Sequence, residues 1–93
     1  MKIVKTEDYL ETLKEILTYI AKDKKSVAIS FNRELNKKIN NLKEFPYIYR
    51  TSIYFDNKNI RDLTFKGYTV VYEVNRKSKT ITIIGITKYK NTL

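Results

Sequence analysis

The chain has 93 residues, with nineteen lysines and arginines against ten acidic residues and a formal net charge of +9. It contains no cysteine and no histidine, which excludes disulfides, thiolate zinc sites and thiol nucleophiles and removes the usual acid–base catalyst at neutral pH. The length suits a single domain over residues 1–93. The charge favours nucleic acid, an anionic surface or an acidic protein segment as partner, or else marks a merely soluble basic protein.

The first part of the chain predicts a short strand and a helix. Residues 1–5 are the strand candidate, and Thr6 is suited to cap the helix that follows. Apolar residues then recur at steps of three and four up to residues 21–25, as in an amphipathic helix. No apolar run is long enough to span a membrane, and residues 1–11 turn acidic where a signal peptide would stay apolar, so we expect a cytoplasmic protein without a membrane partner.

A second helix is expected directly after the first. Asp23 or Ser26 would cap it, and Pro46 would stop it. Its apolar face repeats with helical period through Val27, Phe31, Leu35, Ile39 and Leu42. The two helices would form an antiparallel hairpin whose apolar side needs a cover.

The second half of the chain predicts strands that supply this cover. Residues 51–55 and 60–65 are strand-like, with turn residues between them. In the second of these strands, Leu63 and Phe65 share one face with Arg61. A further strand follows Gly67, with one face made of Tyr68, Val70, Tyr72 and Val74.

The last strand is expected after a hairpin loop at residues 75–79. It covers residues 80–87, and its isoleucine pattern changes phase at Ile83 and Ile84 next to Gly85, which predicts a bulge or bend. The sequence therefore predicts an α+β fold in the order βααβββ. The N-terminal helical hairpin would pack on a small, mostly antiparallel twisted sheet, on the face that carries Tyr72.

Eight tyrosines are a high load for this length. Near lysines and arginines they can stack on bases, as in proteins that bind single strands. Tyr68 and Tyr72 are in phase with valines, which favours packing against the helices. Tyr47 and Tyr49 follow no clear period, so both interpretations stay open for them.

Arg61 stands at the boundary of an apolar stripe. Its planar guanidinium could bind phosphate in a concave surface. The alternative is an ion pair with Glu73 or Asp62.

The C-terminal stretch "KYK" places a phenol between two ammonium groups. Lys88, Tyr89 and Lys90 could serve a metal-free ribonuclease, with the lysines stabilising charge and the tyrosine moving a proton. The alternative is a solvated C-terminus. Two glycines allow no glycine-rich phosphate loop, and no close carboxylate pair indicates a metal centre, so we expect no cofactor and no metal.

Several stretches resemble the RelE/ParE toxin superfamily over nearly the whole chain. They are the hairpin ending in "LKEFP", the arginine of "NIRDL", then "KGYTVVYEV" and "ITIIGITKY". The spacing of the arginine, "GY" and "VVY" is the most specific of these features. The resemblance implies a toxin of a bacterial type II toxin–antitoxin system, which inhibits growth and is neutralised in a hetero-oligomer by a cognate acidic antitoxin.

The superfamily has two branches with different targets. Ribosome-dependent mRNA endonucleases resemble RelE and commonly carry an arginine after the "GY" pair, where this chain has Thr69. They also favour an arginine near the end of the last strand, where this chain has Lys88 and Tyr89. The resemblance therefore implies a ParE-like inhibitor of DNA gyrase. The alternatives are a RelE-like endonuclease acting on ribosome-bound mRNA and a non-toxic basic RNA-binding module, and whether the chain is an enzyme stays open.

The candidate site residues follow from these interpretations. For a nuclease, the catalytic candidates are Arg61, Lys88, Tyr89 and Lys90. For binding of the antitoxin or of phosphate, the candidates are Arg50, Arg61, Lys66, Lys88, Tyr89 and Lys90. The antitoxin is expected to supply acidic side chains to Arg61, Lys66, Lys88 and Lys90 and to add a strand or helix along an exposed edge or groove.

Overall fold

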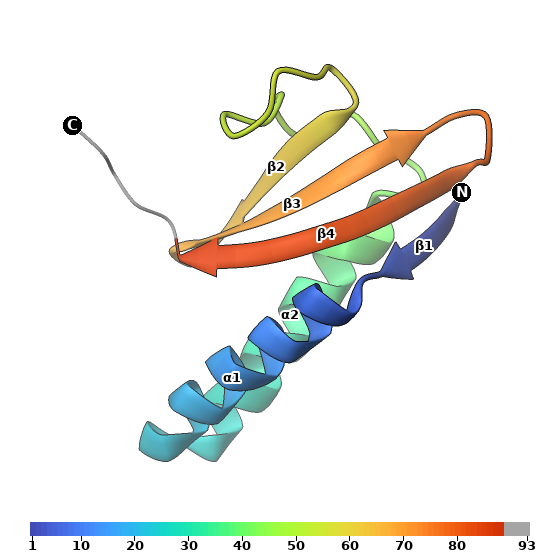
Figure 1. The fold of residues 1–93 in the computed structure, drawn as a ribbon. Coiled ribbons are helices and arrows are strands. Elements are labelled where there is room, and N and C mark those ends of the chain that lie inside the picture. The colour runs from blue at the N-terminus through green and yellow to red at the C-terminus, as the bar shows by residue number, and fades with distance from the viewer. Residues whose placement is uncertain (89–93) are drawn as a thin grey trace.

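The computed structural model describes residues 1–88, which form two helices packed on one face of a four-stranded sheet (Figure 1). The elements in chain order are β1 (Lys2–Lys5), α1 (Glu7–Asp23), α2 (Lys25–Asn41), β2 (Ile60–Phe65), β3 (Tyr68–Asn75) and β4 (Thr80–Lys88). The strand order across the sheet is β1-β4-β3-β2. β1 pairs with β4 in parallel, and the other two pairings are antiparallel. The predicted α+β class and the order βααβββ are confirmed.

The start of α1 is tied to the sheet by Thr6. Its side-chain oxygen accepts a hydrogen bond of 3.1 Å from the Tyr9 amide, as expected of a capping residue. The same hydroxyl donates to the carbonyl oxygen of Ile84 in β4, at 2.8 Å. Thr6 thus fixes the helical hairpin relative to the central part of the sheet.

The connection between the helices is short. Lys24 alone separates them, and it occupies the capping position of α2 without a side-chain cap. The prediction that Asp23 or Ser26 caps α2 is wrong, because Asp23 ends α1 and Ser26 already lies inside α2. At its other end α2 stops at Asn41, and helix-like turns continue to Phe45, directly before Pro46.

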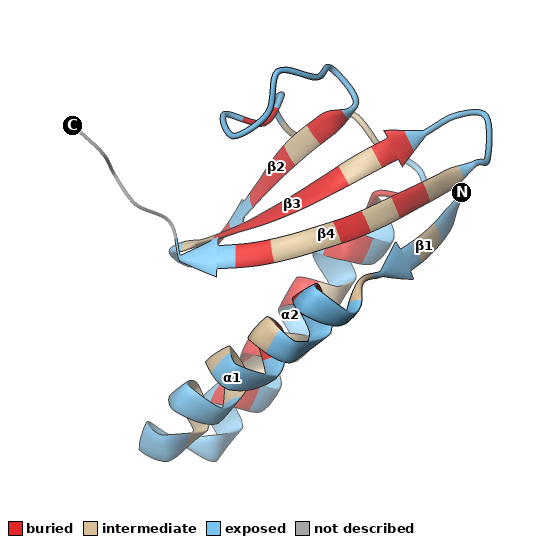
Figure 2. Cartoon of the chain, viewed as in Figure 1, coloured by how far each residue is buried: buried red, intermediate tan, exposed pale blue. Residues whose placement is uncertain are grey.

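The core lies between the helices and one face of the sheet, where Figure 2 shows buried residues along β2, β3 and β4. Its largest fully buried side chains include Tyr9, Leu35, Ile39, Leu63, Tyr72, Ile81 and Ile83. The face of β3 with Tyr68, Val70, Tyr72 and Val74 is the one that packs in this core, as predicted. Val27 was expected there and is 49% exposed; the neighbouring Ala28 is 7% exposed and is in phase with Phe31 and Leu35 instead.

A bulge bends β4 where the isoleucine phase changes. Val71 pairs with Gly85 and Tyr72 with Ile83, so that Ile84 is the extra residue. The bulge keeps Ile83 and Ile86 both in the core although their spacing differs from the strand period of two. The predicted irregularity at this point is confirmed.

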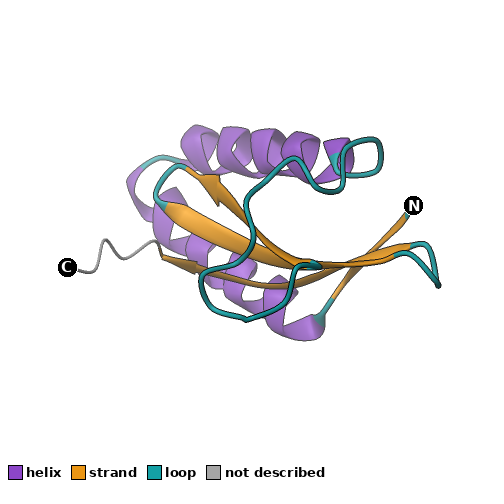
Figure 3. Cartoon of the chain, turned by 90° about the horizontal axis from the view of Figure 1, so that it is seen from above, coloured by secondary structure: helices purple, strands orange, loops and turns teal. Residues whose placement is uncertain are grey.

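The loop from α2 to β2 passes over the sheet face opposite the helices, as Figure 3 shows from above. Residues 51–55 were predicted to form a strand, and this is wrong: only Thr51 makes an isolated bridge, to Arg61. Side chains compete for the backbone groups here. The Asp62 carboxylate accepts from the Ile53 amide at 3.0 Å, and the Ser52 hydroxyl accepts from the Tyr54 amide at 3.1 Å.

Candidate functional site

The candidate residues lie near opposite ends of β2. Lys66 lies at its C-terminal end, in the turn to β3, and Lys88 pairs with Tyr68 directly after that turn. Arg61 lies near the N-terminal end of β2, where it pairs with Tyr72. Tyr89 and Lys90 lie outside the described residues. The structure therefore brings Lys66 and Lys88 to one end of the sheet and leaves Arg61 toward the other.

A groove of about 610 Å³ runs along the C-terminal half of β2. Arg50 and Lys66 supply its cations, and the complete lining consists of Ile48, Tyr49, Arg50, Asp62, Thr64, Phe65, Lys66, Gly67 and Tyr68. Lysine and arginine beside apolar and aromatic side chains suit an acidic, amphipathic partner. Arg50 was among the predicted binding residues.

The groove borders an open strand edge. The Ser52 amide donates to the Ile60 carbonyl at 2.8 Å, and the Asp62 amide donates to the Arg50 carbonyl at 3.1 Å, so the loop covers the first half of the edge. The outward-facing amide two residues further on belongs to Thr64, because ladder bonds alternate along an antiparallel strand. Within residues 1–88 no backbone acceptor lies opposite this amide. The open half of β2 can pair with an added strand.

The turn that closes this end has two residues with positive φ, Lys66 at 45° and Gly67 at 84°. This is the geometry of a tight two-residue hairpin. It places the Lys66 ammonium 2.9 Å from the Glu34 carboxylate of α2. The hydrogen bond from Lys66 lowers the pKa of the Glu34 carboxyl. Both side chains are about half exposed, so a competing anion can reach the lysine.

Lys88 borders a second, smaller groove of about 340 Å³ between α1 and the end of β4. Its lining consists of Thr12, Ile16, Tyr19, Tyr68, Ile86, Thr87 and Lys88. Tyr68 lines both grooves, and its ring packs edge-on against Phe31 with 5.6 Å between centroids. The two grooves therefore meet at Tyr68, with one lysine on each side.

Arg61 is held by backbone carbonyls. Its Nε donates to the Lys58 carbonyl at 2.9 Å, and its Nη1 donates to the Tyr49 carbonyl at 3.0 Å. The ion pair suggested with Glu73 or Asp62 does not form, since Lys66 and Glu34 make the one ion pair among the described residues. Arg61 thus joins the loop before β2 to the strand itself.

Tyr47 contacts two arginines, and the sequence did not indicate these contacts. The guanidinium carbons of Arg61 and Arg76 lie 4.8 Å and 5.2 Å from the centre of its ring. Its hydroxyl donates to the Asn59 side-chain carbonyl at 2.9 Å and accepts a long hydrogen bond from Arg76 Nε at 3.4 Å. Arg76 was not a candidate, because 29 residues separate it from Tyr47 and only the fold brings the two together.

The buried titratable groups do not point to acid–base chemistry. Burial raises the pKa of Tyr9 to about 12 and also raises the pKa of Tyr72, so neither phenol ionises at neutral pH. One oxygen of the buried Asp62 carboxylate accepts from the Ile53 amide, and the other has no partner. The described part of the chain has no group of three or more acidic residues placed to hold a metal ion, and none of its helices is long and apolar enough to cross a membrane.

Comparison with known proteins gives a family match and several structural matches. The family model for the ParE toxin of the type II toxin–antitoxin system parDE matches residues 3–91. A chromosomal ParDE toxin–antitoxin system from P. aeruginosa contains a similar structure, with a TM-score of 0.75, 16% identity and 97% coverage of both chains. No curated protein matches the sequence.

Two structures from E. coli extend the comparison. The isolated RelE toxin matches with a TM-score of 0.70 and 17% identity, over 98% of this chain and 86% of that one. The intact RelBE toxin–antitoxin complex contains a chain that matches with a TM-score of 0.66 and 17% identity, over 95% of this chain and all of that one. At such identities these matches establish the fold.

Proposed function

The chain belongs to the ParE toxin family of type II toxin–antitoxin systems, and from this membership we propose that it inhibits DNA gyrase and is neutralised by an acidic antitoxin. The observation that carries the proposal is the ParE model itself, which spans residues 3–91 and so includes both helices and all four strands. We further propose that residues 1–93 act as one domain, because a single core joins both helices to the sheet.

The distribution of polar groups supports a binding function over a nuclease. A metal-free ribonuclease needs cations and a proton donor gathered around one phosphate. Arg61 lies toward the N-terminal end of β2, and Lys88 pairs with Tyr68 near the other end of the sheet. Thr69, where the ribonuclease branch commonly has an arginine, is 1% exposed. Inhibition of gyrase requires only a complementary surface.

A RelE-like endonuclease is the second candidate. The observation in its favour is the likeness to the isolated E. coli RelE toxin, with a TM-score of 0.70. Arg50, Lys66 and Lys88 would then face the RNA backbone, with Tyr89 and Lys90 as further candidates.

The antitoxin is proposed to bind where the two grooves meet at Tyr68. Ile48, which is exposed, and Tyr68, which is half-buried, offer apolar contacts there, and such contacts carry most of the affinity in protein interfaces. Arg50, Lys66 and Lys88 would attract its carboxylates and speed association. The open half of β2 would accept an added strand. The structural neighbours include a toxin–antitoxin complex.

A supercoiling assay tests the proposed target. Purified toxin is added to gyrase and relaxed plasmid, alone and after preincubation with its antitoxin. We expect loss of supercoiling with the toxin alone and recovery with the antitoxin. In parallel, the toxin is added to ribosomes translating a defined message. Undisturbed gyrase together with cleavage inside codons would replace this proposal with the endonuclease.

A further inference from the structure

We propose that the end of the sheet at which β3 turns into β4 binds the phosphodiester backbone of a nucleic acid. The binding surface, here called the hairpin-end surface, consists of Lys2, Lys58, Arg61, Arg76, Lys77 and Lys79. It lies at the opposite end of β2 and β3 from the two grooves assigned to the antitoxin. The inference goes beyond gyrase inhibition and does not depend on it.

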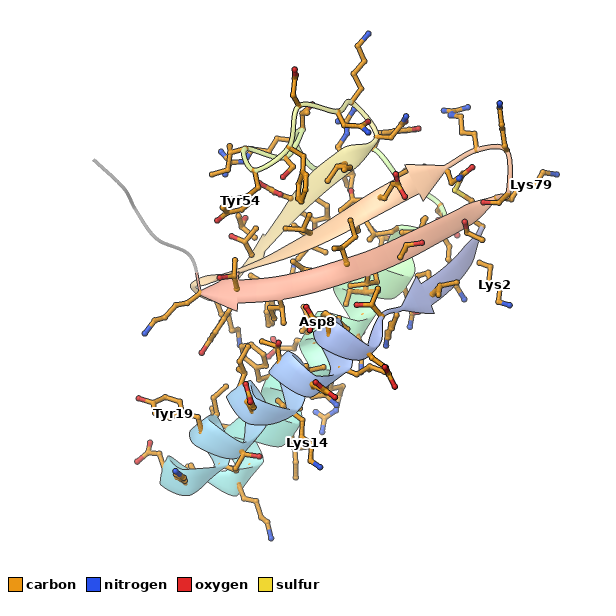
Figure 4. The ribbon with its side chains drawn as sticks, viewed as in Figure 1. Lys2, Asp8, Lys14, Tyr19, Tyr54 and Lys79 are labelled. Carbon is orange, nitrogen blue, oxygen red and sulfur yellow. The ribbon has the colours of Figure 1, made fainter. Side chains whose placement is uncertain are left out.

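Backbone hydrogen bonds bring these cations together from three parts of the chain. The Val74 amide donates to the Asn59 carbonyl at 2.8 Å, so the turn before β2 lies beside the end of β3. The Lys2 amide donates to the Lys79 carbonyl at 2.9 Å, which adds β1 to the same end. Figure 4 shows Lys2 and Lys79 at this end of the sheet, and Tyr19 well away from it near the far end of the helical hairpin.

The positive charge of this surface is not neutralised within the described residues. The one ion pair there joins Lys66 to Glu34, at the other end of β2. Four of the cations lie in two turns, residues 56–59 before β2 and residues 75–79 between β3 and β4. The acidic residues nearest to them in sequence are Asp56 and Glu73, and neither pairs with them. Several like charges held close together repel one another and attract an anion, which relieves the repulsion.

Tyr47 holds two of the cations in place. The guanidinium groups of Arg61 and Arg76 both lie over its ring, at 4.8 Å and 5.2 Å, and cation–π attraction fixes their planes. Arg61 uses Nε and Nη1 for carbonyls, and Arg76 uses Nε for the Tyr47 hydroxyl. Each arginine therefore keeps terminal N–H groups that can donate to phosphate oxygens, which planar guanidinium groups match well.

The composition of the two turns favours nucleic acid over an acidic protein. Residues 56–59 are "DNKN" and residues 75–79 are "NRKSK", without one apolar side chain. Protein partners bind through aromatic and aliphatic anchors that become buried in the interface, and these are available at Ile48 and Tyr68 at the other end of β2. Phosphate contacts by lysine and arginine need no such anchor and carry no sequence preference.

Fluorescence anisotropy with the full chain tests the proposal. The probes are a duplex DNA of about 20 base pairs and a single-stranded RNA of about 20 nucleotides, long enough for several phosphate contacts. Both are titrated at several salt concentrations, with polyglutamate as competitor. The test variant combines Arg76→Gln, Lys77→Gln and Lys79→Asn, since asparagine tolerates the φ of 54° at Lys79. The control combines Lys14→Gln, Lys22→Gln and Lys38→Gln on the exposed helix faces, and removes the same charge.

We expect the control to bind like the unchanged chain. The test variant should bind at least about tenfold more weakly in low salt. For each phosphate that the variant no longer neutralises, the slope of log K against log salt should be reduced by roughly 0.9 for duplex DNA or roughly 0.7 for RNA. The tighter probe identifies the nucleic acid. Equal weakening of both triple variants, or polyglutamate competing as well as DNA of equal charge, would overturn the proposal.

A second pair of variants tests whether binding depends on the placement of the two guanidinium groups as well as on their charge. Tyr47→Leu removes the ring under both guanidinium groups but keeps every cation, so binding should weaken severalfold. Tyr47→Phe keeps the ring and should retain most of the affinity. Full binding by folded Tyr47→Leu would contradict the role of the ring.

Discussion

The hydroxyl of Tyr72, in the middle of β3, donates a hydrogen bond of 2.8 Å to the carbonyl oxygen of Pro46 at the start of the loop before β2. The Tyr72 side chain is fully buried and Pro46 is half-buried, so the bond is partly buried. The loop that it anchors carries Arg50 of the proposed antitoxin groove and Tyr47, which supports the hairpin-end surface. One contact thereby supports both candidate surfaces.

Replacing Tyr72 with phenylalanine should destabilise the fold. Tyr72→Phe removes this partly buried hydrogen bond, and a typical bond of this kind contributes about 0.5–1.5 kcal/mol. Urea unfolding followed by circular dichroism measures the change. Tyr19→Phe is the control, because Tyr19 is 71% exposed, and it should unfold like the unchanged chain. Equal stability of Tyr72→Phe and the control would contradict the anchoring role.

Removal of the buried Tyr9 hydroxyl should not destabilise the fold, in contrast to removal of the Tyr72 hydroxyl. The Tyr9 hydroxyl has no hydrogen-bond partner, so Tyr9→Phe should leave stability at neutral pH unchanged or raise it by up to about 1 kcal/mol. Burial raises the pKa of Tyr9 from 10.0 to about 12, and the folded state therefore favours the protonated phenol. The stability that this shift contributes is complete below pH 10.0 and is lost as the pH rises to about 12, because the unfolded phenol ionises first.

Alkaline titration of the free energy of unfolding measures this effect. The curve of Tyr9→Phe should fall less steeply between pH 10.0 and about 12 than that of the unchanged chain. Tyr72 retains its own alkaline sensitivity, since burial raises its pKa as well. A curve of unchanged steepness would show that Tyr9 ionises equally in both states.

The two glycines should respond differently to alanine. Gly67 has a φ of 84°, and Gly67→Ala should lower the free energy of unfolding by about 1–2 kcal/mol. Gly85 lies in the β4 bulge without a positive φ, and an added Cβ there has no neighbour within 4 Å. Gly85→Ala should therefore be neutral or slightly stabilising. Thermal unfolding compares the two, and a larger loss at Gly85 would contradict the turn assignment.

Reversal of one groove charge should slow binding of the antitoxin. Arg50→Glu places a carboxylate beside the groove, so the association rate with an acidic antitoxin should fall about tenfold or more in low salt and much less in high salt. Lys37→Glu, on the exposed side of α2, changes the net charge equally and is the control. Stopped-flow kinetics compares them. Equal rates for both variants would place the antitoxin elsewhere.

Hydrophobic periodicity predicted the fold well because most core side chains recur with the period of their helix or strand. The apolar face of β3 was recognised, and so was the bulge at Ile84, where the period of two is interrupted. The apolar face expected for α1 was recognised except for Leu10, which is 48% exposed. The Val27 error has a simple origin: Val27 and Ala28 both lie within about one turn of Phe31. Hydrophobicity favoured the valine, whereas the orientation of the helix buries the smaller alanine.

The loop at residues 51–55 shows what local pattern could not predict. Its isoleucine and aromatic residues have high strand propensity, but Asp62 and Ser52 capture the Ile53 and Tyr54 amides. Propensity gives way to such side-chain contacts. The position of Arg61 beside Tyr47 and the approach of Arg76 depend on the same loop, so the hairpin-end surface could be identified only from the folded chain.

Controlled expression in a bacterium tests the central claim most directly. Within minutes of induction, messenger RNA is sampled by 5′-end mapping and plasmid DNA by supercoiling gels, with and without the antitoxin. Inhibition of gyrase predicts intact messages together with altered supercoiling or gyrase-linked breaks, all suppressed by the antitoxin. Cleavage within translated codons with unchanged plasmid topology would contradict the account and assign the toxin to ribosome-bound mRNA.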